Sequence, residues 1–179
     1  MSKEITFDSE LIYDGRIMQV YKDDVILENG KHAVREYVHH NGGASILAVD
    51  EEDNVYLVTQ FRYPYRKEIW EIPAGKLEKG EDPLSCAVRE LEEEAGLKAE
   101  KFTLIAELYP TPAYTDEKLY VYLATNLSFT NAHLDEDEFL SVKKIPLRDA
   151  LKMAKNGEIH DGKTLVALYS YAAKKLTEN

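Results

Sequence analysis

The 179-residue sequence contains a single cysteine, Cys86, and it lacks any apolar run of the roughly 18 residues needed to cross a bilayer. One cysteine cannot form an internal disulfide, which is typical of proteins from reducing compartments. Residues 1–7 carry no apolar segment of the kind found in secretory signal peptides. We therefore expect a soluble, cytoplasmic protein that does not bind membranes.

Basic residues are also scarce. The chain has 22 Lys and Arg against 33 Asp and Glu, which gives a formal net charge of −11. Nucleic acids are bound through clustered positive charge, so this balance argues against DNA or RNA as a partner. Repeats and low-complexity segments are absent as well. Apolar residues make up 44% of the sequence, which is enough to build the core of one domain.

Short β-type runs separated by turn residues dominate the chain. The first two runs are joined by Asn29-Gly30, a strong hairpin signal. Helices are expected over 83–94, 147–155 and 163–176. The strand-like runs are 17–27, 32–39, 44–49, 55–61, 69–72, 102–109, 119–127 and 139–145. This pattern predicts an α/β fold with a mixed sheet between helices.

The helix expected over 83–94 has clear boundaries. Asp82 is a good N-cap, Pro83 is tolerated at the first helical position, and Gly96 can adopt the left-handed conformation that ends a helix. Apolar side chains at helical spacing form one stripe, which we expect to be the buried face. The stripe consists of Leu84, Ala87, Val88, Leu91 and Ala95.

Three carboxylates, Glu90, Glu93 and Glu94, share a separate arc of the same helix, because positions i, i+3 and i+4 are neighbours. Their mutual repulsion and their place near the negative end of the helix dipole both oppose folding. A bound divalent cation removes both penalties, and oxygen ligands favour Mg²⁺ or Mn²⁺. The alternative is a solvated acidic face.

Arg89 is expected to pair with Glu81 or with one of the helix carboxylates and to fix its orientation. The alternative is an ordinary surface ion pair that contributes little. Cys86 lies one turn before Glu90, but a thiol is a poor ligand for hard cations. We therefore interpret Cys86 as a small filler residue.

The segment from Gly75 through Glu81, Arg89, Glu90, Glu93 and Glu94 to Gly96 resembles the Nudix box without a departure. The resemblance implies hydrolysis of a nucleoside diphosphate linked to another moiety. It implies an α/β/α sandwich for residues 43–179, and Mg²⁺ held by Glu90, Glu93, Glu94 and the backbone carbonyl of Ala74. In this family the arginine and first glutamate of the box, here Arg89 and Glu81, orient the acidic cluster.

Further segments resemble the ADP-ribose pyrophosphatase branch of that family. They are residues 60–64, 69–75 and 109–117, and Pro112 lies at the offset from Gly96 that marks the branch. The resemblance implies that ADP-ribose is hydrolysed to AMP and ribose 5-phosphate. Pro112 taken alone is as readily a plain loop proline.

The same branch suggests roles for residues outside the box. Arg35 and Arg62 match arginines that bind phosphate or stack near adenine, although an arginine taken alone is more often a surface residue. Glu117 matches a residue that hydrogen-bonds the distal ribose. The acidic run 134–139 reads by composition as a solvated loop. By resemblance, Glu136 is the base that acts on water and Glu138 assists metal binding, and the two roles are interchangeable.

Residues 1–42 are expected to form a small β appendage, which in this branch contributes to a homodimer. Two other functions stay open. One is hydrolysis of another nucleoside diphosphate sugar, such as GDP-mannose or ADP-glucose. The other is a catalytically silent sensor that binds ADP-ribose, although such domains lose a box glutamate and this chain keeps Glu90, Glu93 and Glu94.

Overall fold

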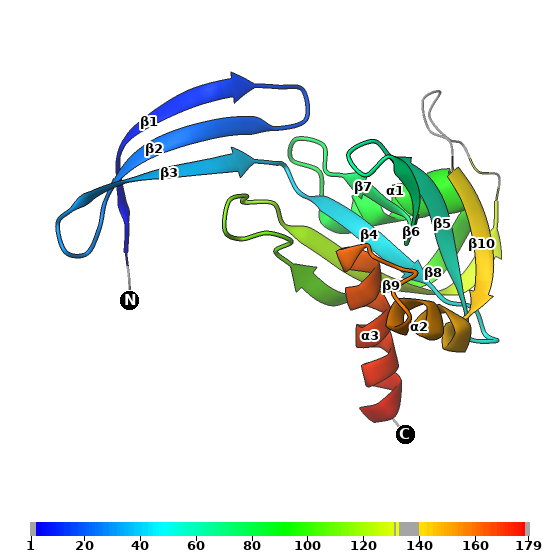
Figure 1. Cartoon of the computed structure of the whole chain (residues 1–179). Helices are drawn as coiled ribbons and strands as arrows, with labels where there is room; N and C mark the ends of the chain where they lie inside the picture. Colours follow the sequence, from blue (N-terminus) through cyan, green and yellow to red (C-terminus); the bar gives the residue numbers. More distant parts are fainter. Residues whose placement is uncertain (1–2, 131, 133–139, 178–179) are drawn as a thin grey trace. The chain divides into compact units, whose positions relative to one another are not determined.

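The computed structural model describes residues 3–130, 132 and 140–177 (Figure 1). The chain divides into two compact units. The first consists of residues 1–42 together with Tyr109–Lys118, and the second of Gly43–Leu108 together with Leu119–Asn179. The second unit contains the glutamate-rich helix.

The first unit is built on an antiparallel sheet in the order β1-β2-β3, formed by Ile5–Asp14, Gln19–Ile26 and His32–His39. The expected hairpin turn joins β2 to β3, and Gly30 adopts a φ of 77°, which glycine tolerates best. Strand β1 is not among the strands predicted from the sequence. All ten of its residues are exposed, so it lacks the pattern that burial imposes on a strand.

The segment Tyr109–Lys118 adds to this sheet through main-chain bonds on either side of one residue. Val38 N donates to Tyr114 O at 2.8 Å, and Asp116 N donates to Val38 O at 3.1 Å. A loop that is distant in sequence therefore extends the edge of β3.

The second unit holds two sheets. An antiparallel sheet has the order β10-β5-β6, formed by Leu140–Pro146, Asn54–Arg62 and Lys67–Glu71. A mixed sheet has the order β7-β4-β9-β8, formed by Ala74–Lys76, Gly43–Ala48, Leu119–Phe129 and Leu97–Leu108, and within it β4 and β9 run parallel.

Three helices complete this unit: α1 (Pro83–Ala95), α2 (Leu147–Lys155) and α3 (Gly162–Thr177). Strand β4 is buried on both faces, because its successive side chains enter two different cores. Ile46 packs in the core beneath α1 with Leu91, whereas Leu47 packs in the core beneath α2 and α3 with Leu168. The expected α/β fold with a mixed sheet and helices on both faces is confirmed.

The expected buried face of α1 is partly wrong. Leu84 and Val88 are 38% and 41% exposed, whereas the buried positions include Glu90 and Glu94. The helix is rotated because its acidic arc packs against β7, as the contacts of Glu90 and Glu94 described below show. No helix in the described part of the chain is long and apolar enough to span a bilayer.

Candidate active site

Local signals set both ends of α1. The Asp82 carboxylate accepts a hydrogen bond from Ser85 N at 3.0 Å, which satisfies one of the free N–H groups of the first turn. At the other end Gly96 has a φ of 61°, and its N–H donates to Glu92 O at 3.1 Å. These two caps fix which residues α1 presents to the neighbouring strands.

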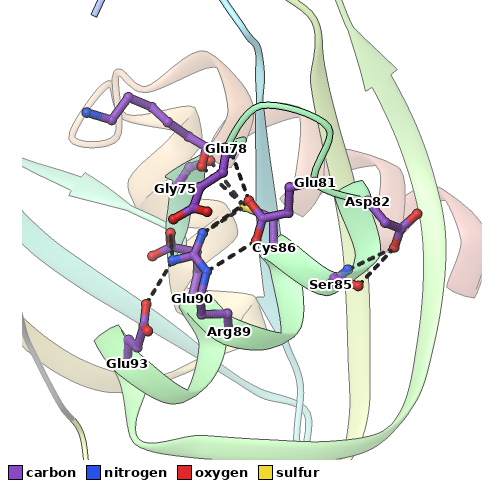
Figure 2. Close-up of polar contacts among 10 residues, drawn as sticks. Gly75, Glu78, Glu81, Asp82, Ser85, Cys86, Arg89, Glu90 and Glu93 are labelled. Carbon is purple, nitrogen blue, oxygen red and sulfur yellow. Dashed lines mark hydrogen bonds and ion pairs between the residues drawn. The ribbon is translucent and has the colours of Figure 1, made fainter. Parts of the chain in front are cut away.

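Arg89 binds two glutamates of the helix, Glu90 and Glu93, and Glu81 of the preceding turn (Figure 2). Its Nη1 donates to Glu90 Oε1 at 2.6 Å and to Glu93 Oε2 at 2.9 Å, and its Nε contacts Glu81 Oε1 at 3.3 Å. Burial opposes the charge of Arg89, but these carboxylates outweigh it and raise its pKa. The expected pairing of Arg89 with Glu81 and with box carboxylates is therefore present.

Glu81 is itself held by the turn that precedes the helix. Its Oε2 accepts a hydrogen bond from Glu78 N at 2.9 Å. This backbone bond, followed by the hydrogen bond from Arg89, lowers the pKa of Glu81. Glu81 is thus kept ionised and in place as a support for the arginine.

Gly75 is required by the position of Glu90. A Cβ atom at residue 75 would lie 1.6 Å from Glu90 Oε1 and 2.0 Å from its Cδ, so only glycine leaves room for this carboxylate. Glu90 is 7% exposed and rests directly against the backbone of β7. The first glycine of the box therefore has a steric role in the site.

Glu94 contacts the residue just before this glycine. Its Oε2 accepts a hydrogen bond from Ala74 N at 2.9 Å, and Glu94 is 3% exposed. Ala74 lies opposite Ser45 in the β4–β7 pair, while the neighbouring Pro73 O accepts from Ile46 N. Polar groups of successive residues point alternately toward and away from the paired strand. The N–H and carbonyl of Ala74 consequently point away from β4.

The carboxylates of Glu90, Glu93 and Glu94 and the Ala74 carbonyl have the chemistry expected of ligands for a hard divalent cation. They are all oxygen atoms, and Glu90 and Glu93 already converge on a positively charged group. Within residues 3–130, 132 and 140–177, no three His, Cys, Asp or Glu side chains are grouped closely enough to hold a metal as they stand. Glu90 and Glu93 contact Arg89 instead, and Glu94 accepts from Ala74 N. The residues present nevertheless fit such a cation, since Gly75 leaves room for Glu90 and the carbonyl of Ala74 is directed away from β4.

Cys86 lies beneath this cluster as a buried filler. Its Sγ is 3.7 Å from Gly75 O and 3.6 Å from Lys76 O. Burial, reinforced by the negative charges of Glu81 and Glu90, raises the pKa of the thiol to about 12. Cys86 is therefore a neutral packing residue and no candidate ligand or nucleophile.

A second polar network surrounds Arg62 at the end of β5. Arg62 forms a bidentate ion pair with Glu71, through Nε–Oε1 at 2.6 Å and Nη2–Oε2 at 2.7 Å. Lys163 at the start of α3 contacts the same carboxylate and also Asp161 Oδ1, the latter at 3.0 Å. Burial opposes ionisation of Glu71, but the two cations outweigh it and lower its pKa. These residues line a hollow of about 550 Å³ together with Tyr65 and His160.

The remaining candidates outside the acidic run belong to the first unit. Arg35 on β3 is half exposed and binds Glu4 through its Nε at 2.8 Å. Glu117 is partly buried, and its Oε1 lies 3.4 Å from His40 Nδ1. Pro112 is exposed in a turn that the hydrogen bond from Tyr114 N to Thr111 O closes.

Two assignments lie outside the described residues. They are Glu136 and Glu138, the expected base and its partner, so their roles stay predictions. Three polar residues near the site, Glu71, Lys163 and Thr164, were not predicted from the sequence. The contacts of Lys163 with Glu71 and of Thr164 with Ile72 span 92 residues of chain, so no local pattern predicts them.

Comparisons with known proteins agree with this geometry. Residues 39–168 match the NUDIX domain, and residues 4–38 match the nucleoside diphosphate sugar hydrolase N-terminal domain. An "ADP-ribose pyrophosphatase" of Bacillus subtilis is 46% identical over 93% of this chain and 91% of its own length. A "Methanol dehydrogenase activator" of Bacillus methanolicus is 42% identical with the same coverage. A crystal structure of an "ADP compounds hydrolase" has a TM-score of 0.86 at 21% identity, covering 99% of this chain and 96% of that one, which supports the fold.

Proposed function

The chain belongs to the NUDIX family of hydrolases, and on that basis we propose that it cleaves the diphosphate of ADP-ribose to give AMP and ribose 5-phosphate. The observation that carries the proposal is the complete acidic cluster of α1, with Glu90 and Glu94 buried against β7. The 46% identity to an ADP-ribose pyrophosphatase over nearly the whole chain supports this choice of substrate.

Glu90, Glu93, Glu94 and the carbonyl of Ala74 hold the divalent cation in this proposal. Mg²⁺ is the expected ion, and Mn²⁺ is a substitute, because all the donors are oxygen atoms. When bound, the cation neutralises the diphosphate and lowers the pKa of a coordinated water. Arg89 keeps Glu90 and Glu93 together on one side of the helix, and Glu81 anchors Arg89.

Substrate binding is assigned to Arg62 and, by resemblance, to Arg35, Glu117 and Pro112. Arg62 carries a permanent charge, and Glu71 sets its orientation by binding Nε and Nη2, so phosphate is bound through the N–H groups that Glu71 does not engage. In the first unit, Arg35 contacts the adenine or phosphate part, Glu117 accepts from the distal ribose, and Pro112 stiffens the loop that carries Glu117.

Glu136 removes the proton from the attacking water, and Glu138 assists metal binding. A general base contributes roughly 10²–10⁴-fold to the rate. Replacing Glu136 with Gln should therefore lower kcat by that factor and leave KM nearly unchanged. A rise in KM with unaltered kcat would remove Glu136 from this role.

The first unit also supports a homodimer. Strand β1 exposes several large apolar side chains, which a solitary chain would leave in water. They are Ile5, Phe7, Leu11, Ile12 and Tyr13. Sedimentation equilibrium at micromolar concentration should give twice the chain mass of 20.5 kDa. A monomer at that concentration would end the dimer proposal.

The decisive test is a panel of nucleoside diphosphate sugars at fixed Mg²⁺, with the products separated by chromatography. ADP-ribose should be cleaved fastest, and it should release AMP. Faster cleavage of GDP-mannose or ADP-glucose would change the substrate and keep the family chemistry. Binding of ADP-ribose without cleavage of any compound would indicate a silent sensor.

A matched variant tests the metal assignment. Replacing Glu94 with Gln keeps the shape of the side chain and an oxygen that can accept from Ala74 N, but it removes the negative charge. The variant should fold and lose turnover by orders of magnitude. Normal Mg²⁺-dependent activity in Glu94→Gln would remove Glu94 from the metal site.

A further inference from the structure

We propose that Thr164, at the start of α3, is a positioning residue for the backbone carbonyl of Ala74, and this inference rests on the metal site proposed above. Thr164 is fully buried at 0% exposure. Its Oγ1 accepts a hydrogen bond from Ile72 N at 2.8 Å and donates one to Asp161 Oδ2 at 2.6 Å. The hydroxyl therefore links the first turn of α3 to the chain that runs from β6 into β7.

The segment 72–74 is held from three directions. Ile72 N is bonded by Thr164 of α3, Pro73 O accepts from Ile46 N of β4, and Ala74 N donates to Glu94 of α1. Pro73 has no N–H of its own, so the Thr164 bond engages the last backbone donor before Ala74. The bond from Ile46 holds the segment from the β4 side, and the bond from Glu94 comes from one of the metal-binding residues itself.

Thr164 is thereby the anchor of this segment on α3. Without its hydroxyl, Ile72 N loses the buried acceptor that fixes the peptide two residues before Ala74. The Ala74 carbonyl then depends on the β4 pairing and on the Glu94 carboxylate for its direction. Groups that orient metal ligands from behind typically change metal affinity or activity by about 10–100-fold when they are removed.

Asp161 completes the anchor. Its Oδ2 accepts from both Thr164 N and Thr164 Oγ1, at 2.9 Å and 2.6 Å, which fixes the rotation of the hydroxyl and leaves its lone pair toward Ile72 N. One carboxylate oxygen thus caps α3 and also sets the direction of the Thr164 bond.

The test compares Thr164→Val, which keeps the shape and removes the hydroxyl, with Thr164→Ser, which keeps the hydroxyl. The control is Tyr171→Phe, because it removes another α3 hydroxyl whose partner is Asp53 Oδ1. The main readout is Mn²⁺ binding to the substrate-free protein, followed through the electron paramagnetic resonance signal of the free ion. Melting temperature, kcat and KM for ADP-ribose are measured alongside.

Thr164→Val should weaken Mn²⁺ binding by about tenfold and lower kcat, with KM for the nucleotide unchanged. Thr164→Ser and Tyr171→Phe should bind Mn²⁺ like the parent protein. Parental Mn²⁺ affinity in Thr164→Val with only a lower melting temperature would overturn the inference and leave the proposed function intact. Mn²⁺ binding weakened by about tenfold in Thr164→Ser, which keeps the hydroxyl, would also overturn it, and this result does not depend on whether the valine variant folds. A parent protein that binds no Mn²⁺ would instead refute the metal site on which the inference rests.

Discussion

Replacing Gly75 with Ala should lower kcat strongly and lower the stability of the protein only modestly. The added Cβ would lie 1.6 Å from Glu90 Oε1, whereas ordinary contact begins near 3.4 Å, so this oxygen must retreat by about 1.8 Å. The three nearest atoms, Oε1, Cδ and Cγ, all belong to the Glu90 side chain, so this side chain must turn as a whole, and φ at residue 75 lies outside the left-handed region. The backbone can therefore stay in place while the carboxylate moves.

The two effects have different expected sizes. Displacing Glu90 breaks its 2.6 Å bond to Arg89 Nη1, which costs roughly 1.5–3 kcal/mol for a charged hydrogen bond. Replacing glycine by alanine returns about 0.4–1 kcal/mol through the unfolded state. The free energy of unfolding should thus fall by about 0.5–2.6 kcal/mol. Because a misplacement of about 1 Å can cost 10²-fold in rate, kcat should fall by about that factor or more.

Urea denaturation and steady-state kinetics measure these quantities, and a double-mutant cycle identifies the cause. In a Glu90→Ala background, Gly75→Ala should lower kcat no further, because the carboxylate that it displaces is already absent. Gly162→Ala is the stability control, since its Cβ would meet nothing within 4 Å. The steric role of Gly75 would be refuted if the fold losses of kcat in the two single variants multiplied in the double variant. Parental activity in Gly75→Ala would refute it as well.

Three further predictions concern single side chains. The pKa of Glu71 is lowered from its ordinary value of 4.5, so its stabilising effect is complete above that pH and is lost as the pH falls through the folded pKa. Glu71→Gln should therefore reduce the slope of unfolding free energy against pH in acid, and an unchanged slope would contradict the ion pair with Arg62. The buried Cys86 thiol, with a pKa of about 12, should not react with Ellman's reagent at pH 8 until the protein unfolds, and rapid labelling of the native protein would disprove its burial. Asp82→Ala should destabilise the protein by about 1 kcal/mol through loss of the α1 cap while Asp82→Ser does not, as measured in urea.

The sequence predicted those features whose causes are local. The start and end of α1 follow from Asp82 and Gly96, which act on their own turn of backbone. The pairing of Arg89 with Glu93 follows from helical spacing. The charge pattern likewise indicated an acidic cluster before any tertiary contact was known.

Features set by distant contacts were not predictable in this way. The predicted buried face of α1 was partly wrong, because the contact of Glu90 with Gly75 of β7 decides which face of the helix is buried. The partners of Lys163 and Thr164 lie 92 residues earlier in the chain, so no periodicity announces them. Strand β1 has no buried side, and for that reason it gave no alternating signal.

The way in which Tyr109–Lys118 joins the first unit has a consequence for how this protein can be cut, fused or recombined. The unit is composed of two stretches of chain, so it cannot be gained or removed as one block of gene sequence. Deletion of residues 1–42 would remove Val38 and His40, and with them the backbone partners of Tyr114 and Asp116. A stable version of the second unit alone would also need a short linker between Leu108 and Leu119. Exchange of this unit between relatives therefore requires two coordinated replacements.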